Sequence, residues 1–259
     1  MFTSCLTNNK YHIQINRFAL PAIMIMALVV RLIYLSLHPM PLRDGIGYIE
    51  FTQSWFDSGE AAIPQNGAIN PPLFCYLSRA LMFCGFSAST ATILVNLSAG
   101  VLLLIPVYYA GKCLWGTVND GLVSACFAAV MPALVKYSCV RLREGLYFLF
   151  LFSIICCWIY VLKDRNNFRN SFLCGLFCVC GILCRYESVF LLGFVGFTLV
   201  LSKFIIRQWK QGFRVFGFFC AGCFIGWLVV LLLPGFPDVF SIYAHRIYGQ
   251  CLGTFINPV

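Results

Sequence analysis

The chain consists of long apolar runs separated by short polar segments. A helix needs about 20 mostly apolar residues to cross a hydrocarbon core of about 30 Å. Seven runs approach this length, at residues 18–38, 88–111, 118–135, 144–162, 170–185, 188–203 and 213–233. An eighth run, 71–86, is shorter and carries Arg79 near its middle. The pattern predicts an all-α polytopic membrane protein with about seven transmembrane helices.

The distribution of basic residues decides how the eighth run is interpreted. If 71–86 does not cross and the N-terminus is cytoplasmic, the basic segments 163–169 and 203–214 both face the cytoplasm, as the positive-inside rule requires. A crossing at 71–86 would place both segments outside. The sequence therefore predicts an interfacial helix at 71–86, an outer loop at 39–87 and an outer C-terminal segment at 234–259, within a single membrane domain spanning 1–259.

Two further expectations concern the spans themselves. Arg31 lies within the first span and is expected to snorkel to the outer surface. The segment 170–203 could form one long tilted helix, but that would move the basic segment 203–214 outside. We therefore expect a hairpin of two short helices of about 22 Å each, with its turn at 185–187 below the outer surface.

Composition agrees with a membrane protein and excludes other classes. Hydrophobic residues make up 61% of the chain and charged residues 10%, whereas soluble proteins carry about 25% charged residues. The mean hydropathy is +0.86, which excludes disordered and nucleic-acid-binding proteins. The net charge of +9 follows from the cytoplasmic loops. The first run is full-length and lacks a cleavage pattern, so it is expected to be an anchor and not a signal peptide.

The polar residues within the apolar runs suggest no further chemistry. Most of the fifteen cysteines lie in apolar runs, where cysteine behaves as a small hydrophobic residue. Those between 174 and 184 have no histidine or carboxylate among them, so no metal site is predicted there. The sequon at Asn96 falls inside a span and is not expected to be glycosylated.

The outer loop 39–87 is too long for a simple connection. Tyr48, Phe51 and Trp55 recur at helical spacing, which predicts an amphipathic helix lying on the membrane surface. Pro71 and Pro72 are typical of the first turn of a second helix. Together the two helices are expected to form a shelf over the outer face.

Three groups of ionisable residues fall on this predicted outer face. They are Asp44 before the first shelf helix, Arg143 with Glu144, and Arg185 with Glu187. Each group also has a plain structural interpretation, because aspartate caps helices and charged residues anchor span ends. Three groups on one face nevertheless indicate a site. Arginines suit a lipid-linked phosphate, and a neighbouring carboxylate suits a general base.

The order of these residues resembles that of GT-C membrane glycosyltransferases that use lipid-phosphate sugars, the protein O-mannosyltransferase-like and lipid A aminoarabinose transferase-like group. The resemblance covers about residues 20–235. It rests on the following positions: Arg31, Asp44, Tyr48, Pro71-Pro72-Leu73, Gly85, Arg143-Glu144 and Arg185-Tyr186-Glu187. Some relatives have a lysine or histidine where this chain has Asn70. Relatives usually continue through several more spans, so a short or C-terminally truncated member is expected.

The resemblance implies roles for these residues. Asp44 would be the catalytic base, Glu144 would line the donor or acceptor cavity, and Arg143 or Arg185 would hold the donor phosphate. Glu187, Tyr48 and Asn70 are the remaining predicted substrate-binding positions. No resident cofactor is predicted, and the need for a divalent metal is left open.

The predicted function is transfer of a sugar from a polyprenyl-phosphate-linked donor to a hydroxyl of a glycan, lipid or protein on the extracytoplasmic face. Direct displacement needs one base and inverts the anomeric centre, whereas retention would need a second carboxylate such as Glu144 or Glu187. Two alternatives stay open. A transporter or flippase of lipid-linked sugars would also need a cationic cavity, although transporters usually bind at the midplane between repeats. An inactive scaffold or fragment would keep its role without Asp44.

Overall fold

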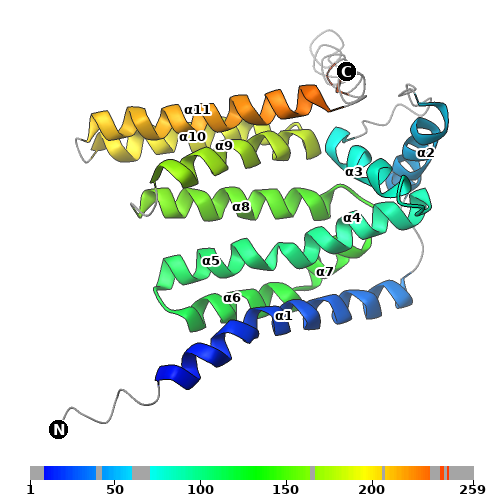
Figure 1. Cartoon of the computed structure of the whole chain (residues 1–259), viewed down its shortest axis with the longest axis horizontal. Helices are drawn as coiled ribbons and strands as arrows, with labels where there is room; N and C mark the ends of the chain where they lie inside the picture. The colour runs from blue at the N-terminus through cyan, green and yellow to red at the C-terminus, as the bar shows by residue number, and fades with distance from the viewer. Residues whose placement is uncertain are drawn as a thin grey trace, which may run out of the picture.

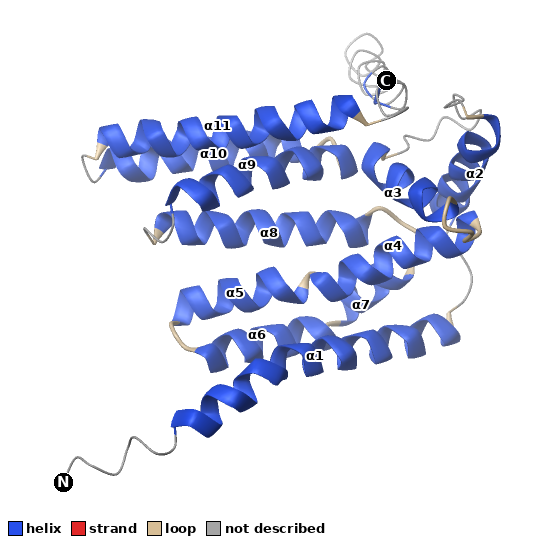
Figure 2. Cartoon of the chain, viewed as in Figure 1, coloured by secondary structure: helices blue, strands red, loops and turns tan. Residues whose placement is uncertain are grey.

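The computed structural model describes residues 9–38, 43–59, 71–163, 167–205 and 208–233, together with 240–241 and 244. Within these ranges the chain is built from helices and connecting loops, with no strand (Figure 2). The predicted all-α fold class is therefore confirmed.

Nine of the helices form a bundle in which most lie side by side along one common direction (Figure 1). They are α1 (Asn9–Leu37), α4 (Ala88–Leu102), α5 (Leu104–Trp115), α6 (Val118–Val130), α7 (Pro132–Cys139), α8 (Glu144–Leu162), α9 (Asn167–Cys184), α10 (Ser188–Ile205) and α11 (Trp209–Leu232). Of these, α7 is bent by 58° from α6. The remaining two, α2 (Arg43–Ser58) and α3 (Pro72–Met82), lie at one end of this bundle. We call that end the shelf end. The α5–α6 and α8–α9 connections lie at the opposite end.

Four helical segments are long and apolar enough to cross a membrane: 18–37, the joined pair α4–α5, α8 and α11. The pair α6–α7 bends by 58° and would make a fifth. The segments 168–184 and 188–202 are shorter apolar helices. The protein is thus an integral membrane protein with several spans, while the total of seven stays a prediction.

Local sequence signals explain where several helices begin and end. Pro71 and Pro72 start α3, because the first helical turn needs no proline N–H. The Ser87 hydroxyl accepts a hydrogen bond from the Thr90 N–H at the start of α4. Gly116 ends α5 with a φ of 98°, a left-handed conformation that suits glycine. These signals set the starts of α3 and α4 and the end of α5.

The predicted hairpin at 170–203 is confirmed. Helices α9 and α10 are joined by the short turn 185–187, in which the Ser188 N–H donates to the Arg185 carbonyl at 3.0 Å. Helix α9 also packs closely on α11. A Cβ at Gly175 would collide with the Phe219 carbonyl, and one at Gly222 with the Phe172 carbonyl, so glycine is what allows this approach.

The structure corrects the predicted setting of the first shelf helix. Helix α2 forms where expected, but its apolar face does not lie on the membrane. Tyr48, Phe51 and Trp55 are buried in one core with Phe74 of α3 and Val95 of α4. The apolar face of α2 is covered by protein. The sequence pattern is the same for both settings, because the end of a helix bundle is as apolar as a lipid surface.

The prediction that Arg31 snorkels to the surface is wrong. Its side chain is fully buried. Nε donates to the Ser138 hydroxyl at 2.8 Å, and Nη1 donates to the carbonyls of Ala27 at 3.1 Å and Ala129 at 3.2 Å. Ala129 lies just before the α6–α7 break, and Pro132 begins the next helix. The broken helix leaves carbonyls without helical N–H partners, and the guanidinium takes up one of them.

Candidate active site

The predicted ionisable residues of α8 and the α9–α10 turn form one cluster at the shelf end. Arg143 Nε lies 3.9 Å from Glu144 Oε1, and Arg185 Nη1 lies 3.8 Å from the same oxygen. Arg185 Nη2 donates to Glu187 Oε1 at 3.3 Å. The Arg185 guanidinium also lies 5.5 Å from the centre of the Tyr147 ring, within cation–π range. Four charges from two distant segments thus share one site.

Asn96 holds the loop that precedes α8. Its Nδ2 donates to the carbonyl of Val140 at 2.6 Å and to the carbonyl of Leu142. Asn96 is fully buried on α4, so these bonds tie residues 140–142 to the bundle. A Cβ at Gly145 would lie 2.7 Å from Asn96 Oδ1, so glycine lets α8 begin against α4. The position of Arg143 and Glu144 follows from this anchoring.

Helix α2 brings Asp44 to the same loop. A Cβ at Gly45 would lie 2.7 Å from the carbonyl oxygen of Arg141, so the first turn of α2 packs directly on the main chain there. Asp44 is exposed in that first turn. An acidic side chain at this position is favoured by the helix dipole. Its carboxylate is therefore accessible at the edge of the charged cluster.

Tyr48 lies one turn further along α2. Its ring packs edge-on against Phe74, with 5.8 Å between the ring centroids. Burial raises the pKa of Tyr48 to about 12; the positive charge of Arg143 works against the rise, and the negative charges of Glu144 and Asp44 add to it. The phenol is consequently protonated at neutral pH and can donate a hydrogen bond but not accept a proton.

Within the cluster, Arg185 and Glu187 stabilise each other's charged form. Burial alone would lower the pKa of Arg185, but the hydrogen bond and charge of Glu187, together with the charge of Glu144, raise it. Burial alone would raise the pKa of Glu187, but hydrogen bonds from its own backbone N–H and from Arg185, with the charges of Arg185 and Arg143, lower it. Both groups are therefore ionised at neutral pH.

Part of the cluster's hydrogen-bonding capacity is unused. Oε2 of Glu144 and Oε2 of Glu187 are buried without a hydrogen-bond partner. The contacts of Glu144 Oε1, at 3.8 and 3.9 Å, are also longer than the 2.7–2.9 Å of charge-assisted hydrogen bonds. These groups can bind polar atoms of a substrate without first breaking short hydrogen bonds. Among the residues that the structure describes, no group of three or more histidine, cysteine or acidic side chains could hold a metal ion.

The sequence-predicted residues therefore meet in part. Arg143, Glu144, Arg185 and Glu187 are in mutual contact, and α2 brings Asp44 and Tyr48 beside them. Asn70 lies outside the described residues. Sequence reasoning missed Tyr147, and it treated Asn96 only as a sequon. Asn96 could have been suspected, because a buried amide within an apolar span needs a polar partner.

The comparison with known families agrees with this arrangement. A family model described as dolichyl-phosphate-mannose-protein mannosyltransferase matches residues 70–231, which is more than half of the chain. The chain belongs to the dolichyl-phosphate-mannose-protein mannosyltransferase family. The predicted resemblance to this group is confirmed, and the all-helical membrane bundle is consistent with its GT-C type fold. A comparison with curated proteins finds no match.

Membership of the mannosyltransferase family gives the class of activity. It points to a glycosyltransferase that uses a polyprenyl-phosphate-linked sugar and works in a lipid bilayer. The matched region contains Arg143, Glu144, Arg185 and Glu187, whereas α1 and α2, with Asp44, precede it.

Proposed function

We propose that this chain transfers a sugar from a polyprenyl-phosphate-linked donor to an acceptor hydroxyl at the shelf end, with inversion and with Asp44 as the general base. The family supplies the class of reaction. The observation that carries the proposed location is the contact of Arg143, Glu144, Arg185 and Glu187 beside the first turn of α2. A glycan, lipid or protein hydroxyl would be the acceptor.

Arg143 and Arg185 are suited to hold the phosphate of the donor. Arginine binds phosphate through several N–H groups, and such charge-assisted bonds are among the strongest hydrogen bonds in proteins. Both arginines contact Glu144 only at long range, and Arg185 can keep its hydrogen bond to Glu187 through Nη2 while Nη1 turns to a phosphate. Their positive charge would then stabilise the negative charge that develops on the leaving phosphate.

The transfer step needs one proton acceptor. The acceptor oxygen attacks the anomeric carbon, the bond from that carbon to the phosphate oxygen breaks, and its electron pair leaves with the lipid phosphate. The acceptor's proton passes to Asp44, whose exposed carboxylate lies at the edge of the cluster. Tyr48, protonated and one turn away, supports α2 beneath Asp44, while Glu144 Oε2 is free to accept a hydrogen bond from a sugar hydroxyl.

We further propose that the shelf end faces the extracytoplasmic side and that the N-terminus is cytoplasmic. The argument is the asymmetry of basic residues. The segments 163–169 and 203–214, with seven lysines and arginines between them, connect helices at the end opposite the shelf.

The test compares Asp44→Asn with wild type and with Glu50→Gln, which removes one exposed carboxylate from the same helix. Each protein is reconstituted in liposomes with polyprenyl-phosphate-mannose and a glycan, lipid or peptide that offers an acceptor hydroxyl, and the formation of bare polyprenyl phosphate is followed by mass spectrometry of the extracted lipids. A general base contributes about 10²–10⁴-fold to rate. We therefore expect at least a hundred-fold fall for Asp44→Asn and no change for Glu50→Gln.

Other outcomes identify the alternatives. Equal turnover in wild type and Asp44→Asn would reject Asp44 as the base. Movement of the intact sugar lipid between leaflets without cleavage would favour a transporter. No turnover in any variant, with the lipid still bound, would favour a scaffold or carrier.

A further inference from the structure

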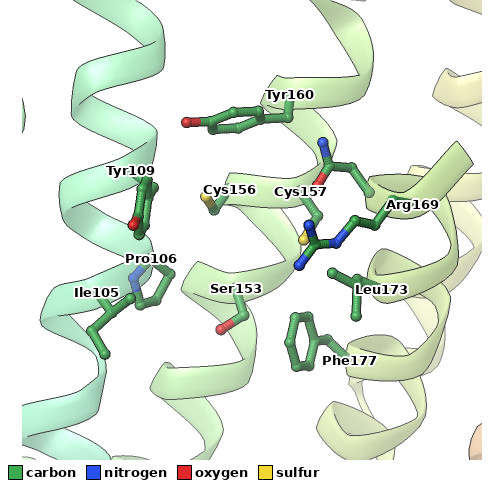
Figure 3. A pocket seen from close by; sticks show the side chains of 11 residues that line it. Ile105, Pro106, Tyr109, Ser153, Cys156, Cys157, Tyr160, Arg169, Leu173 and Phe177 are labelled. Carbon is green, nitrogen blue, oxygen red and sulfur yellow. The ribbon is translucent and has the colours of Figure 1, made fainter. Parts of the chain in front are cut away.

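A cavity of about 470 Å³ lies between α5, α8 and α9, away from the charged cluster (Figure 3). It falls within the size range of about 300–1,000 Å³ that is usual for small-molecule sites. The residues that line it are Ile105, Pro106, Tyr109, Ser153, Cys156, Cys157, Tyr160, Arg169, Asn170, Leu173 and Phe177. None of the reaction steps proposed above uses this cavity.

The residues that line the cavity lie between the middle of the bundle and the end opposite the shelf, over about one leaflet. Its deepest lining residues, Ile105, Ser153 and Phe177, lie nine or ten residues from the helix ends at Trp115, Leu162 and Asn167. At 1.5 Å per residue this is a depth of about 15 Å, or half of a hydrocarbon core of about 30 Å. On α8, the lining residue nearest the charged cluster is Ser153, nine residues and therefore about 14 Å from Glu144, so the cavity is distinct from the cluster.

The lining of the cavity changes from polar near the helix ends to apolar in the deep part. Arg169, Asn170 and Tyr160 lie near the helix ends, whereas Ile105 and Phe177 line the deep part. The Arg169 side chain extends from α9 toward Cys157 on α8 (Figure 3). The Ser153 hydroxyl donates to the Leu149 carbonyl at 2.7 Å, so the deep part presents little free polarity. The eleven lining residues include one guanidinium and no carboxylate.

We propose that this cavity binds one anionic phospholipid, with its phosphate on Arg169 and one acyl chain against the apolar deep wall. The guanidinium matches a phosphate, and the absence of a carboxylate among the lining residues leaves its charge to the ligand. A small anion would satisfy Arg169 but leave the apolar part empty. The basic segments at this end would also attract an anionic leaflet, at about 1 kcal/mol for each lysine or arginine near the surface. The bound lipid fills the space between α5, α8 and α9.

The experiment measures lipid retention and thermal stability for wild type, Arg169→Met and Lys210→Met. Lys210 is an exposed cation at the same end, in the first turn of α11, and does not line the cavity. Each protein is purified in mild detergent with phosphatidylglycerol, or with diacylglycerol, which has the same chains without the phosphate. Native mass spectrometry counts the bound lipid, and Tm is recorded with each lipid and with inorganic phosphate.

We expect wild type and Lys210→Met to retain phosphatidylglycerol and to gain Tm from it, and Arg169→Met to retain at least ten-fold less. Ser153→Phe, which fills the deep part, should also lose the lipid although Arg169 is present. Equal retention by wild type and Arg169→Met would overturn the proposal, and so would equal losses in Arg169→Met and Lys210→Met. If inorganic phosphate raises Tm as much as the lipid does, the cavity binds an anion and not a phospholipid, and the proposal is overturned. None of these results depends on transferase activity, so they stand apart from the outcome for Asp44.

Discussion

Arg31 is hydrogen-bonded in the core to neutral acceptors alone. Its hydrogen bonds go to the Ser138 hydroxyl and to the carbonyls of Ala27 and Ala129, and its Nη2 has no partner. Burying a charge is costly unless hydrogen bonds compensate. Here the compensation comes from a helix break, which turns a carbonyl of α6 into an acceptor for α1.

We therefore expect Arg31→Met to lower the free energy of unfolding by about 1–3 kcal/mol, because the Ala129 carbonyl loses its buried partner. Chemical denaturation in detergent would measure the loss. The neighbouring Leu32→Met, at an exposed apolar position, is the matched control and should change little. If Arg31→Met is as stable as wild type, the stabilisation from the Arg31 hydrogen bonds only equals the free-energy cost of burying its charge.

We expect Glu187 to make the stability of the fold depend on pH in the acid range. Its pKa is lower in the folded protein than its usual value of 4.5, so its ion pair stabilises the fold above that value. This contribution is lost as pH falls through the lowered pKa. Because the side chains are partly exposed, the pair contributes at most about 1 kcal/mol. Wild type should exceed Glu187→Gln in Tm at pH 7, and the difference should shrink as the pH falls below 4.5 and through the lowered pKa of Glu187. A Tm difference that does not shrink on acidification would show that Glu187 acts by packing and not by charge.

Helix α2 is placed by one close backbone contact. Gly45 lets its first turn reach the Arg141 carbonyl, and the buried aromatic face holds the rest of the helix against α3 and α4. This packing brings α2, which precedes residue 70 in the sequence, to the loop that starts α8. The mannosyltransferase-matched region and the preceding helix α2 thus meet at the shelf end of the bundle.

Gly45→Ala should push the start of α2 away from the Arg141 loop. Overpacking of this kind costs about 1–3 kcal/mol, and the displacement of Asp44 should lower kcat more than it raises KM. Gly193→Ala is the control, since a Cβ there meets nothing within 4 Å and alanine favours a helix over glycine. Unfolding in detergent and turnover of polyprenyl-phosphate-mannose would measure both effects. Unchanged turnover in Gly45→Ala would separate the position of α2 from the reaction.

The whole molecule has two chemically different ends. The shelf end carries the mixed-charge cluster and the exposed turn after α3, whereas the opposite end carries the basic segments and the graded cavity.

Cys84 tests which end faces outward. It is exposed in the turn after α3. In a background without Cys5 and Cys251, a membrane-impermeant maleimide should label Cys84 in intact cells, and Cys84→Ser should remove the label. Gln208→Cys, at an exposed position before α11, should react only after permeabilisation. Labelling of Gln208→Cys but not Cys84 in intact cells would reverse the proposed orientation.

Much of the fold could be predicted because apolar length and basic loops are properties of the sequence itself. The runs that became α1, α4–α5, α6–α7, α8, α9, α10 and α11 were all identified, as was the turn at 185–187. The break at Met131 was not, although Pro132 signals it, because one proline in a long apolar run does not disrupt the hydropathy pattern.

The site could be predicted by residue type but not by contact. Arg143, Glu144, Arg185 and Glu187 were selected because ionisable residues are rare beside apolar runs, and such rarity is visible along the chain. Their pairing was not visible, because it depends on how α8 meets the α9–α10 turn. Asn96 escaped for the same reason, since its partners at 140 and 142 are more than forty residues away.

The sequence by itself determined that this chain lies in a membrane, where its helices begin, and which charged residues accompany them. These follow from local solvation and from helix propensity, which act over one or two turns. Only the tertiary structure decided that Arg31 is buried, that α2 turns its aromatic face to protein, and that a cavity forms between α5, α8 and α9. Each of these depends on which surfaces meet, and an apolar surface is equally well covered by lipid or by protein until packing selects one.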